Sequence, residues 1–565
     1  MRTRSCLFLG TIFFVVGASA SACSSSGHSG GGVLSAGDAQ AGACQGSNCE
    51  DSTLGDGGAA GSNAGASGSD SGTVAGCVPQ ATSDDPDDAF TDANCDGIDG
   101  DKSNAIFVSP QGADGASGSF ASPVKSIRQA TELAAKQGKD VYVCTAEYAE
   151  NVVVDTKSVN IYGGYDCSDW SRGNTRAKIA PPSGTALTIR NVTSMSVDRL
   201  MFASADATNP GASSVAVFVA NAGKTSFSHI DATAGAGAAG KPGDVVLSDS
   251  SVAAAGVVGQ DYAACVLSVD GCQLVARVGG DKAPTSCGLE RVHGGAGGDG
   301  ADPHVSPSTP LRGDSGSGGK GSAVPGADGH PGAPGAPAAD GFGSVTTDGY
   351  VPSNAGGNGG IGATGASGGG GKGGYSCGYY SQDLGDCERG GLGNSWTVFG
   401  AGGGQGGYGG CGGFPGKPGG AGGASIAILS FNSQLSISWG SLSTSAGGDG
   451  GVPSDGGAGQ KGGAGGNGGA AVPDGHISST LQPYTAGQDG ARGGNGGKGG
   501  PGGPGGGGPS ITLVAVGDAP TTQAVTFTPA AGGKGAAGLS GQDAASGESS
   551  DVKVIAASAA ADGGS

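Results

Sequence analysis

The sequence predicts an all-β protein: a parallel β-helix with an N-terminal capping helix and long glycine-rich insertions. Between residues 106 and 166, one helical segment is followed by short β-rich segments separated by turn residues, which is the order in which a parallel β-helix begins. Glycine contributes 126 of 565 residues and aromatic residues only 5%. A conventional close-packed core over the whole length is therefore not expected.

The N-terminus predicts export. Met1–Arg4 is positively charged, and Leu7–Val16 is almost wholly apolar. Such a run is too short to cross a bilayer, which needs about 20 apolar residues. The pattern is typical of a secretory signal peptide.

Small residues in front of Cys23 resemble a lipobox, which implies a signal peptide over 1–22 and an acylated Cys23 that anchors the protein in a membrane. Ser24 follows, and by resemblance to Gram-negative lipoproteins this favours the outer membrane or cell surface. Cleavage after Ala20 or Ala22 is the alternative, and it would give a secreted protein.

Cysteine content and charge limit the function classes. Twelve of the fourteen cysteines remain once Cys6 and Cys23 are set aside, and an even number in an exported chain favours disulfides. Zinc is the rival interpretation, but the sequence has no C-x-x-C and its six histidines are scattered. The net charge of −20 argues against nucleic acid as a partner.

Residues 23–76 are Gly, Ser, Ala and Asp with almost no large apolar side chain, which predicts a disordered tether. An acidic module over 77–104 follows. Oxygen-bearing side chains alternate before Gly97, like the front half of a calcium loop, but Ser103 stands where a bidentate Glu is expected. The candidate calcium ligands are Asp92, Asn94, Asp96, Asp99 and Asp101. The alternative is an acidic turn closed by a Cys77–Cys95 disulfide.

A helix should cap the β-helix. Ser122 is a suitable N-cap, Pro123 suits the first helical position, and Gly138 ends the apolar periodicity. The single apolar face needs something to cover, and an open β-helix end exposes an apolar cross-section with unpaired strand edges. We expect this cap and the strands after it to form one domain over 105–233.

Seven short β segments follow in that domain. Cys144 and Cys167 are 23 residues apart, about one coil, and the spacing between stacked strands suits a disulfide between them. An antiparallel sandwich is the rival, but tight hairpin turns are lacking. The segments are Val141–Val143, Val152–Val154, Val159–Ile161, Leu187–Ile189, Val197–Phe202, Val215–Val219 and Thr225–Ile230.

Residues 77–230 resemble secreted right-handed parallel β-helix proteins of the pectate-lyase-like superfamily, many of them Gram-negative lipoproteins of unknown function. The resemblance implies this architecture, but a shared fold implies little about activity. The motifs that carry it are Phe107-Val108-Ser109-Pro110, the capping helix, Val141-Tyr142-Val143, Ile161-Tyr162-Gly163-Gly164-Tyr165, Asn94 to Asp101 and Trp170-Ser171-Arg172.

The apolar strand pattern at Ser214–Val219 returns at Ser425–Ser430 and Ser510–Ala515, each followed by a second β segment. This predicts further β-helix coils at 425–445 and 509–530, separated by glycine-rich insertions at 234–424 and 446–508 and followed by a glycine/alanine-rich tail at 531–565.

The insertions favour a three-residue glycine rhythm, clearest at Gly493–Pro501. That rhythm is typical of extended polyproline-II-type strands, and glycine lets such strands approach closely. The tracts resemble the polyglycine-II bundles proposed for PGRS-type bacterial proteins. Disorder is the alternative, because glycine carries the highest ordering cost. We expect Cys377, Cys387 and Cys411 to staple the first insertion.

Catalytic patterns are sparse, and no catalytic residue is predicted. Asp198-Arg199 is the one adjacent acid–base pair on a clear β segment, and we expect a solvent-facing salt bridge. His229 ends a strand, and we expect it to stand alone. Every GxGxxG match lies in glycine repeats.

The sequence therefore predicts a surface-anchored, non-enzymatic lipoprotein with a structural or adhesive role, whose partner is a polysaccharide or another cell surface. The alternative is a polysaccharide lyase or glycoside hydrolase, which would need a cluster of carboxylates with Arg or Lys on one face. Ice binding through flat polyglycine faces ranks last, because Asp, Lys, Asn and Gln are mixed into the repeats.

Overall fold

The computed structural model describes residues 77–266, 277–281, 285–287, 290–292, 296–299, 323–353, 355–375, 377–381, 395–473 and 485–556. All of them belong to one compact unit, Asp70–Ser565. The predicted signal peptide, Cys23, almost all of the tether and the end of the tail lie outside the described residues, as does Cys387.

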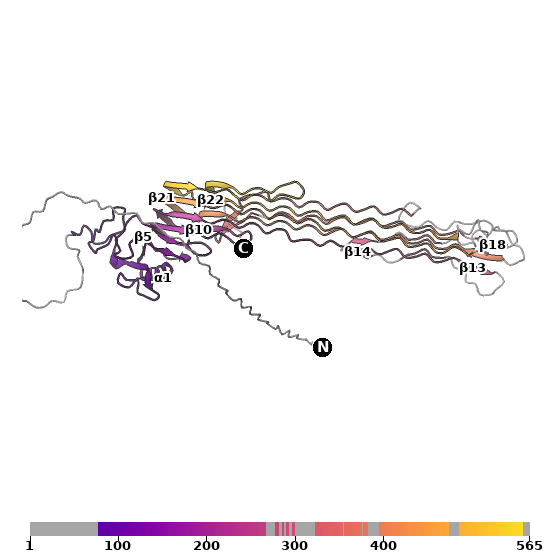
Figure 1. Cartoon of the computed structure of the whole chain (residues 1–565), viewed down its shortest axis with the longest axis horizontal. Coiled ribbons are helices and arrows are strands. Elements are labelled where there is room, and N and C mark those ends of the chain that lie inside the picture. The colour runs from indigo at the N-terminus through magenta and orange to yellow at the C-terminus, as the bar shows by residue number, and fades with distance from the viewer. Residues whose placement is uncertain are drawn as a thin grey trace, which may run out of the picture. The chain divides into compact units, whose positions relative to one another are not determined.

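Parallel strands form three ladders, which the chain visits repeatedly in the same order (Figure 1). Ladders one and two share the long strands β21 (Gln434–Thr444) and β23 (Thr521–Thr528), one half of each strand in each ladder. Ladder one also holds β1 (Ala105–Ala113), β2 (Asp140–Cys144), β5 (Ile161–Tyr165), β8 (Ser194–Asp198) and β11 (Lys224–Ser228). Ladder two holds β3 (Glu147–Tyr148), β6 (Ala177–Ile179), β9 (Leu200–Ala203) and β12 (Asp231–Ala234). Ladder three holds β4 (Val152–Asp155), β7 (Leu187–Arg190), β10 (Ser214–Ala220), β20 (Ser425–Phe431), β22 (Ser510–Val516) and β24 (Ser549–Ile555).

The register stacks apolar side chains of successive strands on one another. Because neighbours in a ladder align residue by residue, each inward position forms a column through the molecule. The columns of all three ladders join one buried cluster, so the core is narrow and long. The column of ladder one consists of Ile106, Val141, Ile161, Val197, Phe227 and Ile437, all at most 1% exposed.

The helix α1 (Ile127–Gln137) packs against β1, β2 and β4, with Ile127, Ala130 and Ala134 buried. Its N-cap is Ser126, whose Oγ accepts from the backbone N–H of Gln129 at 3.2 Å, so the predicted N-cap at Ser122 is wrong. The preceding residues instead extend along β1, where Ala113 N–H donates to the Pro123 carbonyl.

The acidic module packs on the outer face of ladder one. Its Ile98 joins an aromatic cluster with Phe107, Tyr142, Tyr165 and Trp170. A disulfide joins Cys77 to Cys95, and another joins Cys144 to Cys167 across a Cα–Cα distance of 4.9 Å. The one-turn 3-10 helix η1 (Lys102–Asn104) leads from the module into β1.

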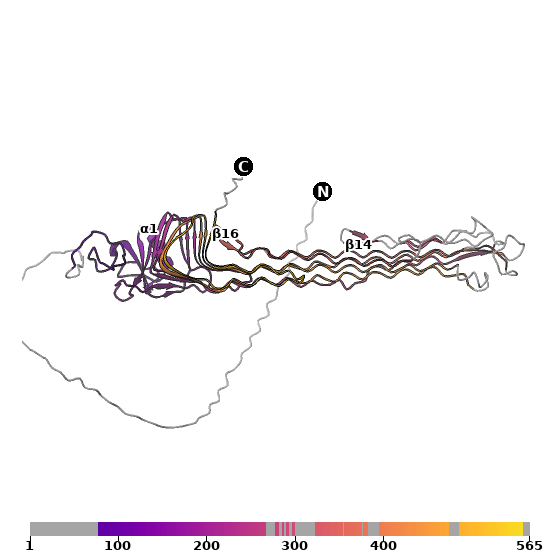
Figure 2. The same ribbon diagram turned by 90° about the horizontal axis from the view of Figure 1, so that it is seen from above.

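The glycine-rich insertions all leave at one corner, between ladders two and three (Figure 2). We call them together the glycine arm: 235–424, 445–509 and 529–548. Their hydrogen bonds recur every third residue: the N–H groups of Gly410, Gly413 and Gly416 donate to the carbonyls of Gly494, Gly497 and Gly500, at 2.8–2.9 Å. The described arm strands thus pair with one another.

Strand 401–423 lies inside the arm. Its consecutive N–H groups point to three neighbours, because Gly403, Gly404 and Gln405 donate to the carbonyls of Gly298, Gln488 and Val257. A Cβ on Gly410 would lie 2.0 Å from the Gln460 carbonyl oxygen, so a side chain there would push two strands apart.

Short strands interrupt the arm, a feature that the glycine rhythm did not predict. β13 (Ala263–Val266), β18 (Cys377–Ser381) and β19 (Ser395–Phe399) form one antiparallel sheet, and β14 (Thr285–Cys287) pairs with β15 (Glu290–Val292). The hairpin of β16 (Ser344–Thr346) and β17 (Gly349–Val351) contributes to a second apolar cluster on ladder three.

Cys411 is bound to Cys287, which lies in the same insertion. The three disulfides indicate an oxidising, extracellular environment. Among the helices of the described residues, none is long and apolar enough to cross a membrane.

Candidate functional site

Two columns of residues with left-handed backbone run along the ladders. One column, the histidine corner, turns the chain from ladder one to ladder two at Arg199, His229, Trp439 and Ala524, with φ between 51° and 57°. Backbone pairing continues through it: the N–H of Arg199 donates to the Ser228 carbonyl and that of His229 to the Ser438 carbonyl, at 3.1 and 3.0 Å.

The second column, the asparagine corner, turns the chain from ladder three to ladder one. It consists of Thr156, Asn191, Asn221, Asn432 and Gly517, all with positive φ. Here too each N–H donates to the next round, as from Asn221 to the Phe431 carbonyl at 2.9 Å. One pair of corner side chains is also bonded, since Asn432 Nδ2 donates to Asn221 Oδ1 at 3.3 Å.

The residue types at the two corners carry different costs. Left-handed backbone costs an ordinary L-residue about 1–2 kcal/mol, whereas Asn and Gly adopt it readily. Arg and Trp are bulky residues that rarely adopt this backbone, although His adopts it more often, and residues held in such conformations cluster at functional sites. The contacts of the side chains at the histidine corner must therefore offset the cost of the left-handed backbone.

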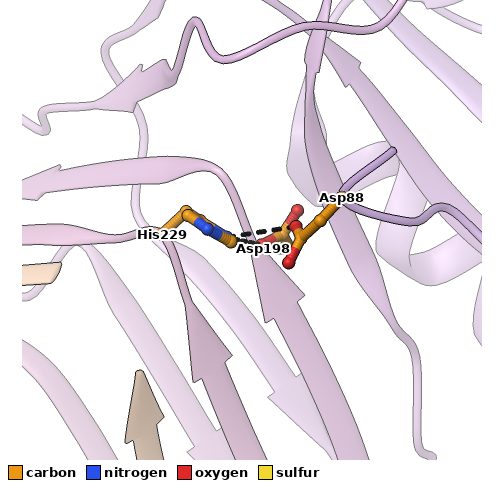
Figure 3. Close-up of side chains that lie close together, drawn as sticks. All are labelled: Asp88, Asp198 and His229. Carbon is orange, nitrogen blue, oxygen red and sulfur yellow. Dashed lines mark hydrogen bonds and ion pairs between the residues drawn. The ribbon is translucent and has the colours of Figure 1, made fainter. Parts of the chain in front are cut away.

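Asp198 is the centre of those contacts (Figure 3). Its side chain is 8% exposed, and those of Arg172 and Arg199 are 0% and 3% exposed. Arg199 Nη1 donates to Asp198 Oδ2 at 2.5 Å, and Arg172 donates to the same oxygen. Ser228 Oγ and His229 Nδ1 donate to Oδ1, at 2.7 and 3.0 Å.

These partners keep Asp198 ionised. Burial alone would raise its pKa, but the hydrogen bond from Ser228 and the charges of Arg172 and Arg199 hold the pKa below its usual value. Asp99 binds Arg172 at 2.9 Å, yet burial raises the pKa of that carboxyl above its usual value. The two guanidinium groups are thus shared among buried carboxylates.

The acidic module completes the cluster from outside. Asp88 Oδ1 accepts from Arg199 Nη2 at 2.9 Å and lies 3.6 Å from His229 Nδ1. The Arg199 guanidinium also lies 4.8 Å from the ring centroid of Phe90. Next to it, the rings of His229 and Trp439 stack with centroids 6.4 Å apart, and Trp439 is 51% exposed.

Two expectations for this region are wrong. Asp198-Arg199 is buried rather than solvent-facing, because the acidic module packs over it. His229 is not alone, because Asp198, one round earlier, accepts its hydrogen bond. The signal lay in the alignment of Val197-Asp198-Arg199, Phe227-Ser228-His229 and Ile437-Ser438-Trp439, in which a buried apolar residue precedes each corner by two positions.

Oxygen atoms of Asp88 and Asp198 and a nitrogen of His229 all lie within 4.8 Å of one another, a spacing that could hold a metal ion. The neighbouring charges oppose this use. Arg199 contacts both carboxylates and Arg172 contacts Asp198, so a cation would have to displace guanidinium groups. We assign the cluster as an ion-pair network.

The predicted calcium ligands separate into two groups. Asp92, Asn94 and Asp96 surround one turn, where they accept the N–H groups of Asp96, Gly97 and Ile98, among others. Asp99 faces Arg172, and Asp101 caps η1 by accepting from Ser103 N–H and Asn104 N–H. The first three side chains therefore lie together at one turn, while the other two have different partners.

A groove of about 820 Å³ lies on the outer face of ladder one, toward the end at which the strands leave the asparagine corner. Polar side chains repeat along it in register: the row Asn160, Ser196, Ser226, Ser436 and Thr521, and the row Ser194, Lys224 and Gln434. Asp518 lies at its C-terminal end. The groove therefore presents hydroxyl and amide groups in a repeating pattern.

No family model, curated protein or solved structure matches this chain.

Proposed function

We propose that the three ladders form a right-handed parallel β-helix, with α1 as its cap and the arm in polyglycine-II conformation. The constant order of the ladders and the right-handed preference of parallel crossovers support the β-helix. Hydrogen bonds at every third residue, directed to several neighbours, support the arm's conformation. The resemblance to pectate-lyase-like and PGRS-type proteins is part of this proposal.

We infer that the protein is a surface-anchored lipoprotein with an adhesive or structural role and that its ligand is a polysaccharide. The single observation that carries this proposal is the groove on ladder one. Sugars offer donors and acceptors at regular intervals along a chain. Repeated Ser, Asn and Gln side chains offer the complementary groups at the spacing of stacked strands.

Binding through such a surface would be multivalent and weak at each contact. Acyl lipid on Cys23 would anchor the protein in the outer membrane, and 23–76 would act as the tether. Trp439 follows Ser436 by three residues on β21, outside the groove lining, and offers a half-exposed apolar ring for stacking.

The test is retention of the full chain on a panel of immobilised neutral and acidic polysaccharides. We expect one class to retain the wild type. The double variant Lys224→Ala/Gln434→Ala should lose most of this retention. A matched pair away from the groove, Val153→Ala on ladder three with Lys178→Ala on ladder two, should retain it. Equal retention by both variants, or none by the wild type, would overturn the proposal.

The second candidate is a polysaccharide lyase or glycoside hydrolase, and the cluster of Asp88, Asp198, Arg199 and His229 favours it. In this cluster Asp198 is held ionised, which suits a charge-stabilising role better than a general acid. Arg199 Nε is buried without a hydrogen-bond partner among the described residues. Assays for new reducing ends and unsaturated products, with Asp198→Asn as the inactive control, distinguish an enzyme from an adhesin.

We also propose a structural calcium ion at Asp92, Asn94 and Asp96. Carboxylate and amide oxygens around one tight turn suit this hard cation. Calorimetric titration of calcium, with magnesium as the comparison and Asp92→Ala as the variant, tests the proposal. Binding that survives the substitution, or no binding by the wild type, would contradict it.

A further inference from the structure

The two ends of the ladders differ. At the N-terminal end α1 covers the core, with Ile127, Ala130 and Ala134 at 0% exposure. At the C-terminal end β24 is the last strand of ladder three, and β23 is the last of ladders one and two in the described part of the chain.

The core is cut open at the C-terminal end. Val552 and Val554 of β24 are 40% and 48% exposed, whereas their partners on β22, Leu513 and Ala515, are fully buried. The outer edge of the last strand offers backbone donors and acceptors for another strand.

We propose that this end is an interface between two copies of the chain, in which β24 pairs antiparallel with β24 of a second copy about a two-fold axis through Val552. In that register, Asp551 of each copy lies opposite Lys553 of the other, so two ion pairs form on one face of the new ladder. On the other face, Val552 and Val554 of both copies continue the apolar core.

Charge complementarity selects the second copy in this register. Asp551 is exposed, and Lys553, two positions further along β24, projects from the same face of the strand, where it also pairs with Glu548. Opposite charges on directly paired residues stabilise an antiparallel pair, and like charges destabilise it.

Because the N-terminal end is covered, association through the C-terminal end stops at a dimer. Head-to-tail stacking would need an open edge at both ends, but α1 occupies one of them. A two-fold contact between like ends uses both open edges and stops at two copies. Each arm leaves at the corner between ladders two and three, which is the N-terminal end of β24. The two-fold axis therefore places the arms of the two copies at opposite ends of the paired strands.

The test is cross-linking of the full chain in detergent with the variant Val552→Cys. Paired Cα atoms on the axis are about 4.5–5.5 Å apart, within the roughly 4.4–6.8 Å range of disulfides. We expect a reducible dimer that neither the wild type nor Lys136→Cys, on the exposed side of the covering helix, forms. Absence of this dimer would overturn the proposal.

Charge exchange provides an independent readout in sedimentation velocity. Asp551→Lys places lysines opposite one another and should convert the dimer to monomer, and adding Lys553→Asp should restore the dimer. A monomeric wild type, or a double variant that stays monomeric while folded by circular dichroism, would contradict the proposal. So would dimerisation that appears only after deletion of residues 557–565, since that tail would then be the natural occupant of the edge.

Discussion

The asparagine corner and the histidine corner have the same backbone and different residues. Both turn the chain between ladders with positive φ, and both keep the N–H bonded to the next round. At the asparagine corner most positions hold Asn or Gly, which adopt this backbone readily, and Asn432 bonds to Asn221. At the histidine corner Arg199 and Trp439 are bulky residues that rarely adopt this backbone. Arg199 and His229 there bind buried or neighbouring carboxylates. The difference separates a corner whose side chains join a buried ion-pair network from a corner whose residue types mostly suit the turn itself.

The largest expected effect is at Arg172, which lies behind the histidine corner. Arg172→Leu leaves Asp99 and Asp198 buried with fewer partners. Breaking a buried ion pair on one side costs about 3–5 kcal/mol of the free energy of unfolding. Denaturant unfolding measures this loss. The exposed pair Lys178–Glu147 is the control, and Lys178→Leu should change stability by less than about 1 kcal/mol.

Replacing Arg199 by glycine tests whether the contacts of its side chain stabilise the protein by more than its left-handed backbone destabilises it. Glycine removes a strain of about 1–2 kcal/mol, but the loss of the contacts with Asp198 and Asp88 costs about 3–5 kcal/mol. We expect Arg199→Gly to destabilise the protein by about 2 kcal/mol in thermal unfolding. If this variant were more stable than the wild type, the side-chain contacts at the histidine corner would not offset its backbone strain, and the proposed difference between the two corners would be wrong.

Asp140 gives a pH-dependent effect on the face beside the groove. Burial raises the pKa of Asp140 to about 6, although the hydrogen bond that the Asn160 amide donates to it at 2.9 Å acts to lower the pKa. The folded state then holds a proton that the unfolded state releases between about pH 4 and 6, so stability falls as the pH rises through that window. With solvent screening, Asp140→Asn should stabilise by roughly 1–2 kcal/mol at pH 7–8 and by little at pH 3.5. Unfolding curves at both pH values check this, and an equal effect at both would refute it.

The smallest effect is expected at the asparagine corner. Asn221→Gly keeps the left-handed backbone and loses the side-chain bond to Asn432. The change should stay within about 0.5–1 kcal/mol. Asn221→Ala, which cannot adopt the conformation freely, should cost about 1–2 kcal/mol. Equal unfolding free energies for the glycine and alanine variants would show that φ does not govern this corner.

Strand positions were predictable because buried apolar segments recur with period two, as in Val152–Val154 and Leu187–Ile189. The break between β8 and β9 at Arg199 was not predictable, because no residue type within Val197–Phe202 indicates a positive φ. The ion-pair network was out of reach for the same reason. Asp88 and Asp198 are more than a hundred residues apart, and only the packing of the acidic module on ladder one joins them.

As the central claim we propose that the histidine corner contributes to ligand binding and that the asparagine corner serves the fold. Polysaccharide retention of two folded double variants tests it most directly. Both His229→Asn/Trp439→Asn and Asn221→Gly/Asn432→Gly carry residues suited to left-handed backbone. We predict that the first loses retention on the polysaccharide that the wild type binds, whereas the second binds like the wild type. Equal retention by both variants would contradict the claim.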